Sequence, residues 1–581
     1  MHGRDVARTS IRIPSMHTTP YGKAFWIAAL AAAATLAGCA SAPRAAKVDV
    51  TLIAFNDFHG NLKPPNLRVK IPDATQAEGV RSVGAGGVEP FSALVQKLRA
   101  EHPYTALVSA GDMVGASPLL SALFADQPTI EAMNQIGVDV HGVGNHEFDH
   151  GIAHLKRLQY GGCEPDAKTG KPDCGGRTPF TGARFPFLAA NVIDESTGKP
   201  LFSPYAIKDF DGIKVAFIGL TLHDTPTLVR PGGTTGTRFA DEVETVNSLV
   251  PLIQLQGVQA IVVLIHEGGR QKGGINDCEG FRGPIKEIAE QFDPAIKVVV
   301  SAHTHEAYIC RFGDRLVTSA GSFGILLTEI DLTLERSSGK IVSARAENKV
   351  VATDGPTDAR LAPMLARYGE LAAPVENKIV AKVSRTLSRR VRPASESELG
   401  NLIADAQLFG TSAPDKGGAE IAFNNQTSLR AAIAPDADGN VNYGALFRAQ
   451  PFQNDLVVMT LNGAQLVRAL EHQWGADLTA SERTLLDVSA GFHYQWDAAK
   501  PEGQRVVPGS LTLYGKPVRA DSTYRVVVNS FLAGGSEGHV VFTEGTDRVV
   551  SVPDLEALVS YLQEQNPYSP PPLGTRVSRL H

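Results

Sequence analysis

Five apolar runs in the first half of the chain each lead into a short segment that carries Asp, Asn or His. These runs lie at residues 50–55, 106–109, 138–143, 260–265 and 296–301. Around them, and around a further run at residues 215–219, are amphipathic stretches at residues 88–100, 129–136, 241–256 and 284–291. Short apolar runs are typical of buried strands, and amphipathic stretches of helices. The alternation predicts an α/β layered domain, in which ligands bind outside the carboxyl ends of the strands.

The segments after the five runs supply seven candidate metal ligands: Asp57, His59, Asp112, Asn145, His266, His303 and His305. Mixed imidazole and carboxylate ligands suit Mn, Fe, Co, Ni or Zn, whereas Ca and Mg prefer oxygen ligands alone. Seven ligands exceed what one ion uses, so the sequence predicts two ions that share a carboxylate. A single histidine at a strand end is more often structural, but five such segments in succession favour the metal interpretation.

These segments, in this order, resemble the motifs of the calcineurin-like metallophosphoesterase superfamily. More narrowly, the chain resembles the two-domain bacterial family of 5'-nucleotidases and UDP-sugar hydrolases, from residue 50 to about residue 541. The resemblance implies an α/β fold, a metallophosphoesterase β-sandwich with flanking helices followed by an α+β nucleotidase C-terminal domain. It also implies two divalent metal ions, Zn, Mn, Co or Mg.

The resemblance assigns the ligands residue by residue. One ion is held by Asp57, His59, Asp112 and His305, and the other by Asp112, Asn145, His266 and His303, so Asp112 bridges them. His146 takes the family's catalytic position, and Asp149 orients it through the usual carboxylate–imidazole pairing. The implied reaction is attack of a metal-activated water on phosphorus, without a covalent intermediate.

The second half of the chain resembles the family's substrate-binding domain. Its implied substrate contacts are Asn401, Asn425, Arg430, Phe452, Asn454, Phe531 and Glu537, with the two phenylalanines as the faces of a base clamp. The alternative for both rings is ordinary core packing. Three departures bear on selectivity: the loop at residues 425–430 lacks the family's glycines, Glu537 stands where Asp is usual, and Ser395 stands where Arg is frequent, although Arg392 is near.

The N-terminus predicts export. Arg4, Arg8, Arg12 and Lys23 precede an apolar run at residues 24–37, which is typical of a secretory signal and too short for an ordinary membrane span. Leu36-Ala37-Gly38-Cys39 also resembles the bacterial lipobox, in which the cysteine is lipidated and becomes the mature N-terminus. The alternative is a plain signal peptide with a chance cysteine. We expect a lipid anchor at Cys39, in the cell envelope, as the only membrane attachment.

The chain has five cysteines, so assigning Cys39 to the anchor leaves four for an oxidising compartment. Cys163 and Cys174 bracket a Gly/Pro/Lys-rich segment, and we expect them to pair. We expect Cys278 and Cys310 to pair across two loops. A zinc cluster is the competing interpretation, but no two of these cysteines have Cys-x-x-Cys spacing.

We expect four regions: a signal peptide at 1–38, a metallophosphoesterase domain at 48–345, a connector helix region at 346–378 and a substrate-binding domain at 379–581. The connector helix is predicted over residues 357–372, ending before Pro374. Asp plus Glu (61) outnumber Lys plus Arg (55), which argues against a nucleic acid polymer as partner. We expect a monomer.

The expected function is an exported 5'-nucleotidase that releases phosphate from nucleoside monophosphates and also acts on UDP-sugars or cyclic nucleotides. A first alternative is a broad-specificity phosphomonoesterase with a diverged pocket. A second, of another class, is a surface nucleotide-binding scavenging protein with little turnover.

Overall fold

The computed structural model describes residues 45–72, 75, 79–163, 179–229, 232–389, 396–474 and 485–580. Residues Lys47–His581 form one compact unit. The predicted signal peptide, Cys39, Cys174, Arg392 and Ser395 lie outside the described residues. Within the described ranges, no helix combines the length and the apolar character that a membrane crossing requires.

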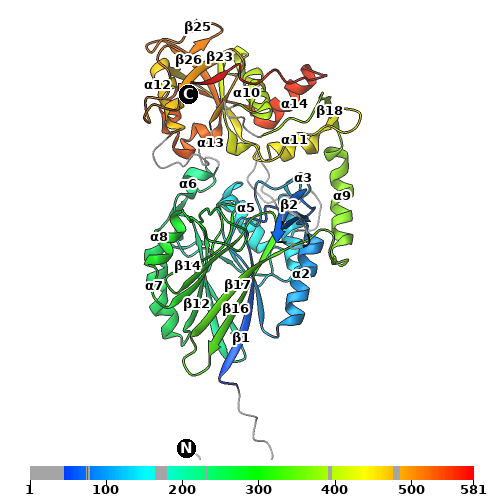
Figure 1. Ribbon diagram of the computed structural model, residues 1–581, viewed down its shortest axis with the longest axis vertical. Helices are drawn as coiled ribbons and strands as arrows, with labels where there is room; N and C mark the ends of the chain where they lie inside the picture. The colour runs from blue at the N-terminus through cyan, green and yellow to red at the C-terminus, as the bar shows by residue number, and fades with distance from the viewer. Residues whose placement is uncertain are drawn as a thin grey trace, which may run out of the picture. The chain divides into compact units, whose positions relative to one another are not determined.

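The first sheet has six strands in the order β17-β16-β1-β4-β5-β6. Strand β1 (Lys47–Phe55) pairs in parallel with β4 (Thr105–Ser109), which continues in parallel to β5 (Val140–Gly142) and β6 (Phe187–Leu188). Strands β16 (Leu326–Glu335) and β17 (Ile341–Val350) complete the sheet as an antiparallel pair on the other side of β1 (Figure 1).

The second sheet also has six strands, in the order β14-β15-β13-β12-β10-β9. Its central strands β15 (Arg315–Ala320), β13 (Ile296–Val300), β12 (Ala260–His266) and β10 (Ile213–Thr221) are parallel. The edge strands β14 (Ala307–Phe312) and β9 (Tyr205–Phe210) are antiparallel to their neighbours. Strands β9 and β10 form an antiparallel hairpin that turns at Asp211-Gly212.

The two sheets pack face to face, and helices cover their outer faces. Alternate residues of β1 point to opposite faces: Leu52 and Ala54 join the core shared with Val262 of β12, and Ile53 joins the core under the helices. The first sheet is covered by α2 (Val88–Glu101), α4 (Gln127–Ile136) and α5 (Gly151–Tyr160), and the second by α7 (Glu242–Leu255) and α8 (Pro284–Gln291). The predicted sandwich with flanking helices is confirmed.

The C-terminal region is built on a five-stranded sheet in the order β22-β19-β26-β21-β27. These strands are β22 (Leu486–Val488), β19 (Ile421–Asn425), β26 (Thr523–Asn529), β21 (Asp455–Asn462) and β27 (Thr546–Pro553). Around them lie α10 (Glu398–Thr411), α11 (Tyr443–Ala449), α12 (Gly463–His472), α13 (Ser530–Ala533) and α14 (Asp554–Glu564). The mixture of parallel and antiparallel pairs confirms the predicted α+β class.

The connector helix differs from its predicted bounds. Helix α9 spans Ala362–Glu376 and continues through Pro374, which the sequence analysis placed beyond its end. Pro374 lies in the last turn, where its missing N–H removes a single helical hydrogen bond, and the N–H of Asn377 still bonds to the carbonyl of Ala373 at 2.9 Å. The helix starts later than predicted because the Asp358 carboxylate accepts hydrogen bonds from Arg360 and holds a turn there.

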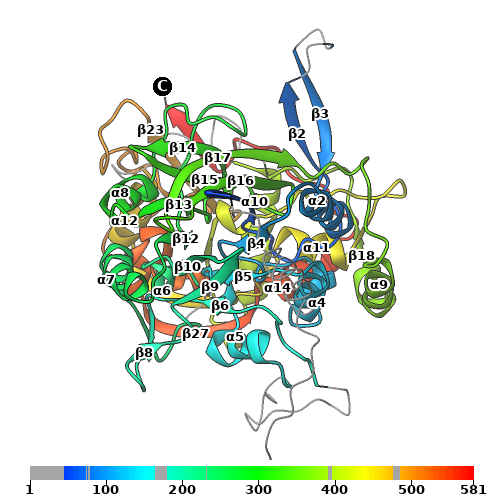
Figure 2. The ribbon, with the colours of Figure 1, turned by 90° about the horizontal axis from the view of Figure 1, so that it is seen from below.

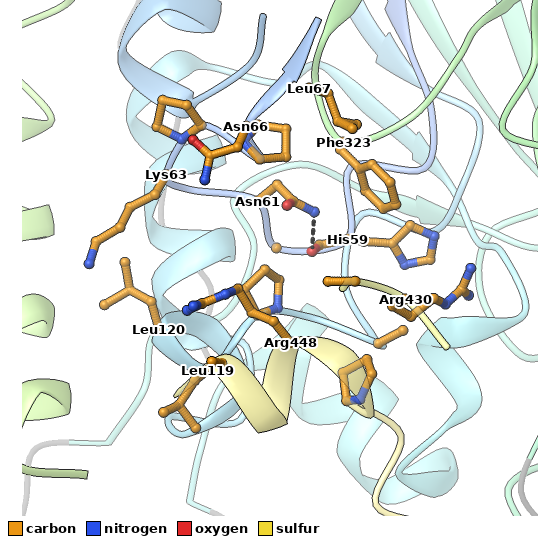
Figure 3. A pocket seen from close by; sticks show the side chains of 18 of the residues that line it. His59, Asn61, Lys63, Asn66, Leu67, Leu119, Leu120, Phe323, Arg430 and Arg448 are labelled. Carbon is orange, nitrogen blue, oxygen red and sulfur yellow. Dashed lines mark hydrogen bonds between the residues drawn. The ribbon is translucent and has the colours of Figure 1, made fainter. Parts of the chain in front are cut away.

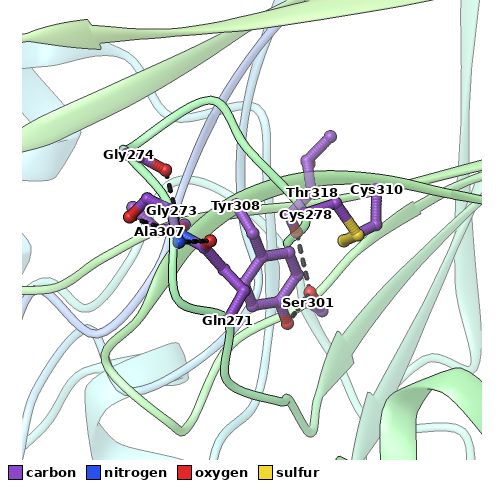
Figure 4. Close-up of a disulfide and its surroundings, with 9 residues drawn as sticks. All are labelled: Gln271, Gly273, Gly274, Cys278, Ser301, Ala307, Tyr308, Cys310 and Thr318. Carbon is purple, nitrogen blue, oxygen red and sulfur yellow. Dashed lines mark hydrogen bonds between the residues drawn. A yellow bond between two sulfur atoms is a disulfide. The ribbon is translucent and has the colours of Figure 1, made fainter. Parts of the chain in front are cut away.

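The first domain also contains a projecting hairpin and a disulfide. Strands β2 (Leu67–Pro72) and β3 (Val80–Ala85) form a hairpin that projects from the rest of its domain (Figure 2). Cys278 and Cys310 form a disulfide, with Cα atoms 5.2 Å apart, beside Tyr308 (Figure 4). That pair confirms the prediction. Cys163 is also disulfide-bonded, and its predicted partner lies outside the described residues.

Candidate active site

The predicted metal ligands come together where strands of both sheets end. The first sheet supplies Asp57 and His59 after β1, Asp112 after β4 and Asn145 after β5, and the second supplies His266, His303 and His305 at the ends of β12 and β13. Five of the seven have a left-handed backbone, with φ of 49° at Asp57, 46° at His59, 49° at Asp112, 69° at His303 and 58° at His305. Such φ values are uncommon outside glycine and occur often at functional sites.

Hydrogen bonds between the loops hold this backbone in place. The N–H of Asp57 donates to the carbonyl of Gly111 at 3.0 Å, and the N–H of His59 donates to the carbonyl of Asp112 at 3.0 Å. The N–H of His303, from the other sheet, donates to Asp57 Oδ2 at 3.0 Å. The seven side chains therefore belong to loops that fix one another across the seam between the sheets.

Two groups of ligand atoms form within this cluster. Asp57, His59 and His305 make one group and Asp112, His266 and His303 the other, with the ligand atoms of each within 4.8 Å of one another. Asp112 Oδ2 lies 3.0 Å from His266 Nε2 and 3.7 Å from His59 Nε2, so it reaches both groups. Asn145 Oδ1 lies 3.1 Å from His303 Nδ1. The seven residues that the resemblance names therefore lie together, in two groups that Asp112 connects.

His146 and Asp149 lie beside the cluster as a hydrogen-bonded pair. His146 Nδ1 is 2.7 Å from Asp149 Oδ2, and the backbone N–H of His146 donates to Asp112 Oδ1 at 2.8 Å. Burial alone would lower the pKa of His146, but the carboxylates of Asp149 and Asp112 outweigh burial, so the pKa is raised. The pair can hold a proton on His146 beside the candidate metal centre.

Glu147 is a buried carboxylate beside the cluster that the sequence did not single out. Its carboxylate is 1% exposed and accepts hydrogen bonds from the backbone N–H groups of Asp112 at 3.0 Å, Met113 at 2.8 Å and Gly144 at 2.6 Å. Burial opposes its charge, but His141, His266 and the hydrogen bond from the Gly144 N–H lower its pKa. Glu147 therefore joins the loops that carry Asp112 and Asn145. Its place between His146 and Phe148 in the motif was the available signal.

A cavity of about 610 Å³ opens over this cluster. Residues from the metal cluster and from the C-terminal region line it together, among them Asp112, Asn145, His146, Asp149, His303, His305, Asn425, Arg430, Phe452, Asn454, Phe531 and Glu537. The exception among the predicted substrate residues is Asn401. It is 1% exposed in α10, and its amide donates to Glu396 Oε2 at 2.9 Å.

Arg430 is one of three arginines that line this cavity, with Arg270 and Arg389. Its guanidinium carbon lies 4.9 Å from the centroid of the Phe452 ring, and its Nε is buried without a hydrogen-bond partner. Burial lowers its pKa, and Asp112 is the first of the carboxylates that oppose this shift. A second cation, Arg389, also lines the cavity and was missed, because the sequence analysis looked for it closer to α10. Together they can bind an anionic group next to the metal cluster.

The loop that lacks the family's glycines folds without them. Residues 425–430 contain the short helix η3 (Gln426–Ser428), and none of them has a positive φ. Asn425 Oδ1 accepts from Asn529 Nδ2 at 2.8 Å, and Glu537 accepts hydrogen bonds from Thr427 and, at 3.4 Å, from Asn425. The departure in sequence therefore leaves an ordered wall, with Glu537 facing the cavity.

Two family models match the chain. The calcineurin-like phosphoesterase model matches residues 50–307, and the 5'-nucleotidase C-terminal domain model matches residues 373–544. The chain belongs to the 5'-nucleotidase family. As a member of that family it is a metallophosphoesterase, and membership implies a dimetal centre and a nucleotide-type substrate.

Similar proteins support this assignment. The 5'-nucleotidase of Vibrio cholerae serotype O1 is 26% identical, over 92% of this chain and 94% of its own. A crystal structure of a 5'-nucleotidase precursor from Thermus thermophilus has a TM-score of 0.71 and 27% identity, covering 92% of this chain and 100% of that one. Endonuclease YhcR of Bacillus subtilis (strain 168) is 29% identical over 89% of this chain, which spans 40% of that protein.

The residues present fit a dimetal centre of the 5'-nucleotidase family. His59 Nδ1 and His266 Nδ1 face the carbonyls of Gly115 at 2.8 Å and Ala110 at 2.9 Å, which leaves each Nε2 turned to the cluster. Asp57 Oδ1 is buried without a hydrogen-bond partner. Two imidazole atoms, His59 Nε2 and His305 Nε2, approach to 3.1 Å. Lone pairs that converge in this way are suited to cations.

The electrostatics agree with this fit. Burial raises the pKa of Asp57 to about 7 and lowers the pKa values of His59, His303 and His305. Burial would also lower the pKa of His266, but the Asp112 carboxylate raises it to about 10. The imidazoles of His59, His303 and His305 are thus neutral, and they lie beside buried carboxylates whose charge a bound cation would balance.

Proposed function

We propose that the protein is an exported 5'-nucleotidase that releases phosphate from nucleoside monophosphates, with UDP-sugars or cyclic nucleotides as further substrates. The observation that carries this proposal is the shared cavity of about 610 Å³, whose lining joins the metal cluster to Arg430, Phe452 and Phe531. A phosphate beside the cluster and an aromatic base between the rings would both lie within that cavity.

Two ions complete the proposed centre. Asp57, His59, Asp112 and His305 would hold one, and Asp112, Asn145, His266 and His303 the other. When bound, two divalent ions acidify a water molecule and neutralise phosphate oxygens during in-line displacement. Zn, Mn, Co and Mg are the candidates.

The chain's own groups supply the remaining steps. The Nδ1–H of His146 donates a hydrogen bond to the carboxylate of Asp149. This bond orients the imidazole so that Nε2 faces the leaving oxygen and can give it a proton. Arg430 and Arg389 balance the charge of the phosphate. Phe452 and Phe531 stack on the base, which is worth about 1–3 kcal/mol per base. Glu537 accepts hydrogen bonds from ribose hydroxyls.

We further infer that residues 48–345 carry the metal centre, that 379–581 carry the nucleoside pocket, and that 346–378 connect them. Residues 1–38 would direct export and Cys39 would carry the lipid. Cys39→Ala should move the protein from the membrane fraction to the soluble envelope fraction. An unchanged membrane fraction would contradict the anchor.

The decisive experiment for the activity is a phosphate-release panel across Mn, Zn, Co and Mg. We expect metal-dependent release from AMP and other nucleoside monophosphates at a higher kcat/KM than from glycerol phosphate. Equal values for AMP and glycerol phosphate would instead identify a broad phosphomonoesterase. Nucleotide binding without release under every metal would identify a binding protein.

A further inference from the structure

A second cavity, of about 690 Å³, adjoins the proposed metal centre (Figure 3). It shares Arg389 and Arg430 with the nucleotide cavity, but neither Phe452 nor Phe531 lines it. Its wall begins at His59 and continues along the segment that follows β1, so one end of the cavity lies at a proposed metal ligand. The centre therefore opens into two cavities.

The walls of the second cavity combine apolar surface with positive charge. The ring of Phe323 lies 5.8 Å from that of His59, and Leu119 and Leu120 form a buried floor. Its described lining holds four cationic side chains and one carboxylate, Glu376. That carboxylate is shared between Lys63, at 3.7 Å, and Arg448, at 3.5 Å. The cavity thus has an excess of positive charge next to apolar surface.

If the substrate is a nucleoside monophosphate, no part of it occupies the second cavity. The phosphorus of a monoester carries a single organic group, which the proposed function places against Phe452 and Phe531. The phosphorus of a diester carries a second group, which must leave the metal centre in another direction. Among the described residues, the cavity that begins at His59 provides that direction, and its volume is in the range of small-molecule sites.

We propose that this cavity binds the second substituent of a nucleotide diester, one that carries a phosphate of its own. This proposal rests on the proposed function, because it uses the same metal centre and base clamp. The apolar wall with Phe323 suits the ring of a second nucleoside, and Lys63 and Arg448 suit its terminal phosphate. The substrate class is a short 5'-phosphorylated dinucleotide.

The reaction balances without a further reactant. The oxygen of one water molecule bonds to the bridging phosphorus, and the bond from that phosphorus to the 5'-oxygen of the clamped nucleoside breaks. The 5'-oxygen takes a proton, and the other proton of the water is released to solvent. For the adenine dinucleotide pApA the products are adenosine and pAp, the 3',5'-bisphosphate.

The experiment compares AMP, pApA and ApA, which lacks the terminal phosphate, with the metal-loaded full protein. Lys63→Glu reverses one charge at the far end, and Ala434→Trp fills the cavity from an exposed position on its wall. The Lys63 side chain is 60% exposed, so its replacement spares the core. Lys97→Glu is the matched control, since Lys97 is 66% exposed on α2 and does not line the cavity.

We expect the wild type to cleave pApA with a higher kcat/KM than ApA. Lys63→Glu and Ala434→Trp should each lower kcat/KM for pApA about tenfold, as one contact worth roughly 1.4 kcal/mol would. Both variants should keep kcat/KM for AMP within about twofold of the wild-type value. Lys97→Glu should change kcat/KM for neither substrate. Equilibrium binding of the product pAp should weaken about tenfold in Lys63→Glu.

The inference is overturned if AMP is hydrolysed and pApA is not, or if pApA and ApA are cleaved equally and Lys63→Glu changes neither. It is also overturned if both variants lower kcat/KM for AMP and kcat/KM for pApA by the same factor. Failure to hydrolyse AMP under any metal is a separate result, which contradicts the proposed function itself.

Discussion

The imidazole ring of His146 stacks on the phenyl ring of Phe452, with centroids 5.7 Å apart and planes inclined by 27°. The two residues come from the metallophosphoesterase domain and the C-terminal domain, and the sequence assigned them different tasks. Arg430 lies 4.9 Å from the centroid of the same Phe452 ring. Phe452 therefore contacts both the proposed acid–base group and the proposed phosphate-binding cation.

Phe452→Ala should lower kcat/KM for AMP roughly 5- to 150-fold, the equivalent of about 1–3 kcal/mol of stacking. The loss for glycerol phosphate should be smaller, because that ester has no base to stack. Phe452→Tyr, which keeps the ring, is the control and should retain most activity. A loss of equal size for both esters would show that the ring serves catalysis through His146 alone.

His146→Ala should lower kcat about 10²- to 10⁴-fold, the usual contribution of a positioned acid–base group. Both metals should remain, because His146 belongs to neither ligand group. The measurement pairs steady-state kinetics with metal analysis of the purified protein. His266→Ala serves as the contrasting variant and should lose metal. Full turnover in His146→Ala would remove the proposed role.

Glu147→Gln should weaken metal binding about 10- to 100-fold, the range for groups that orient ligands from behind. The amide keeps the size of the side chain but loses the charge that accepts three backbone N–H groups near Asp112 and Gly144. Metal titration of the apo-protein measures the effect. Glu101→Gln, an exposed change on α2, is the control. Equal affinities in the two variants would contradict the bracing role.

Because His539 is buried, we expect the folded protein to lose stability at acid pH. Burial, and then the neighbouring His472, lower the pKa of His539 to about 3 in the folded protein, while an unfolded histidine titrates near about 6.5. Between these values the unfolded chain binds the extra proton. The stability therefore falls as the pH drops below about 6.5, by at most about 1.4 kcal/mol per pH unit.

His539→Phe removes this titration and the buried, unpartnered Nδ1. The advantage of the variant in denaturant midpoint should therefore grow as the pH falls from about 6.5 toward about 3. Parallel stability curves for the two proteins over that range would contradict the assignment.

Much of the first domain follows from its sequence because its signals are local. The apolar run from Val50 to Phe55 is typical of a strand buried on both faces, and Asp57 comes two residues after it. The left-handed backbone at Asp57 and Asp112 does not follow, because it depends on hydrogen bonds between loops that are distant in sequence. Local sequence patterns can therefore identify a metal ligand, but they do not give the backbone geometry that orients its side chain.

The less predictable features depend on tertiary contacts. Glu147 gains its role from the N–H groups of Asp112 and Met113, which lie more than thirty residues earlier in the chain. Arg389 could not be placed because the family's spacing pointed closer to α10. The second cavity is assembled from residues between His59 and Pro451, so no single motif predicts it.

The ligand set is divided between two sheets, with Asp57 and Asp112 on one and His266, His303 and His305 on the other. A cation held by both sides would fasten the sheets at their open edge. Ligands that bind only the folded state stabilise it in proportion to the logarithm of their concentration. The thermal midpoint of unfolding should then rise with the concentration of free metal around the protein. Scarcity of metal would therefore shorten the lifetime of the folded enzyme as well as lower its activity.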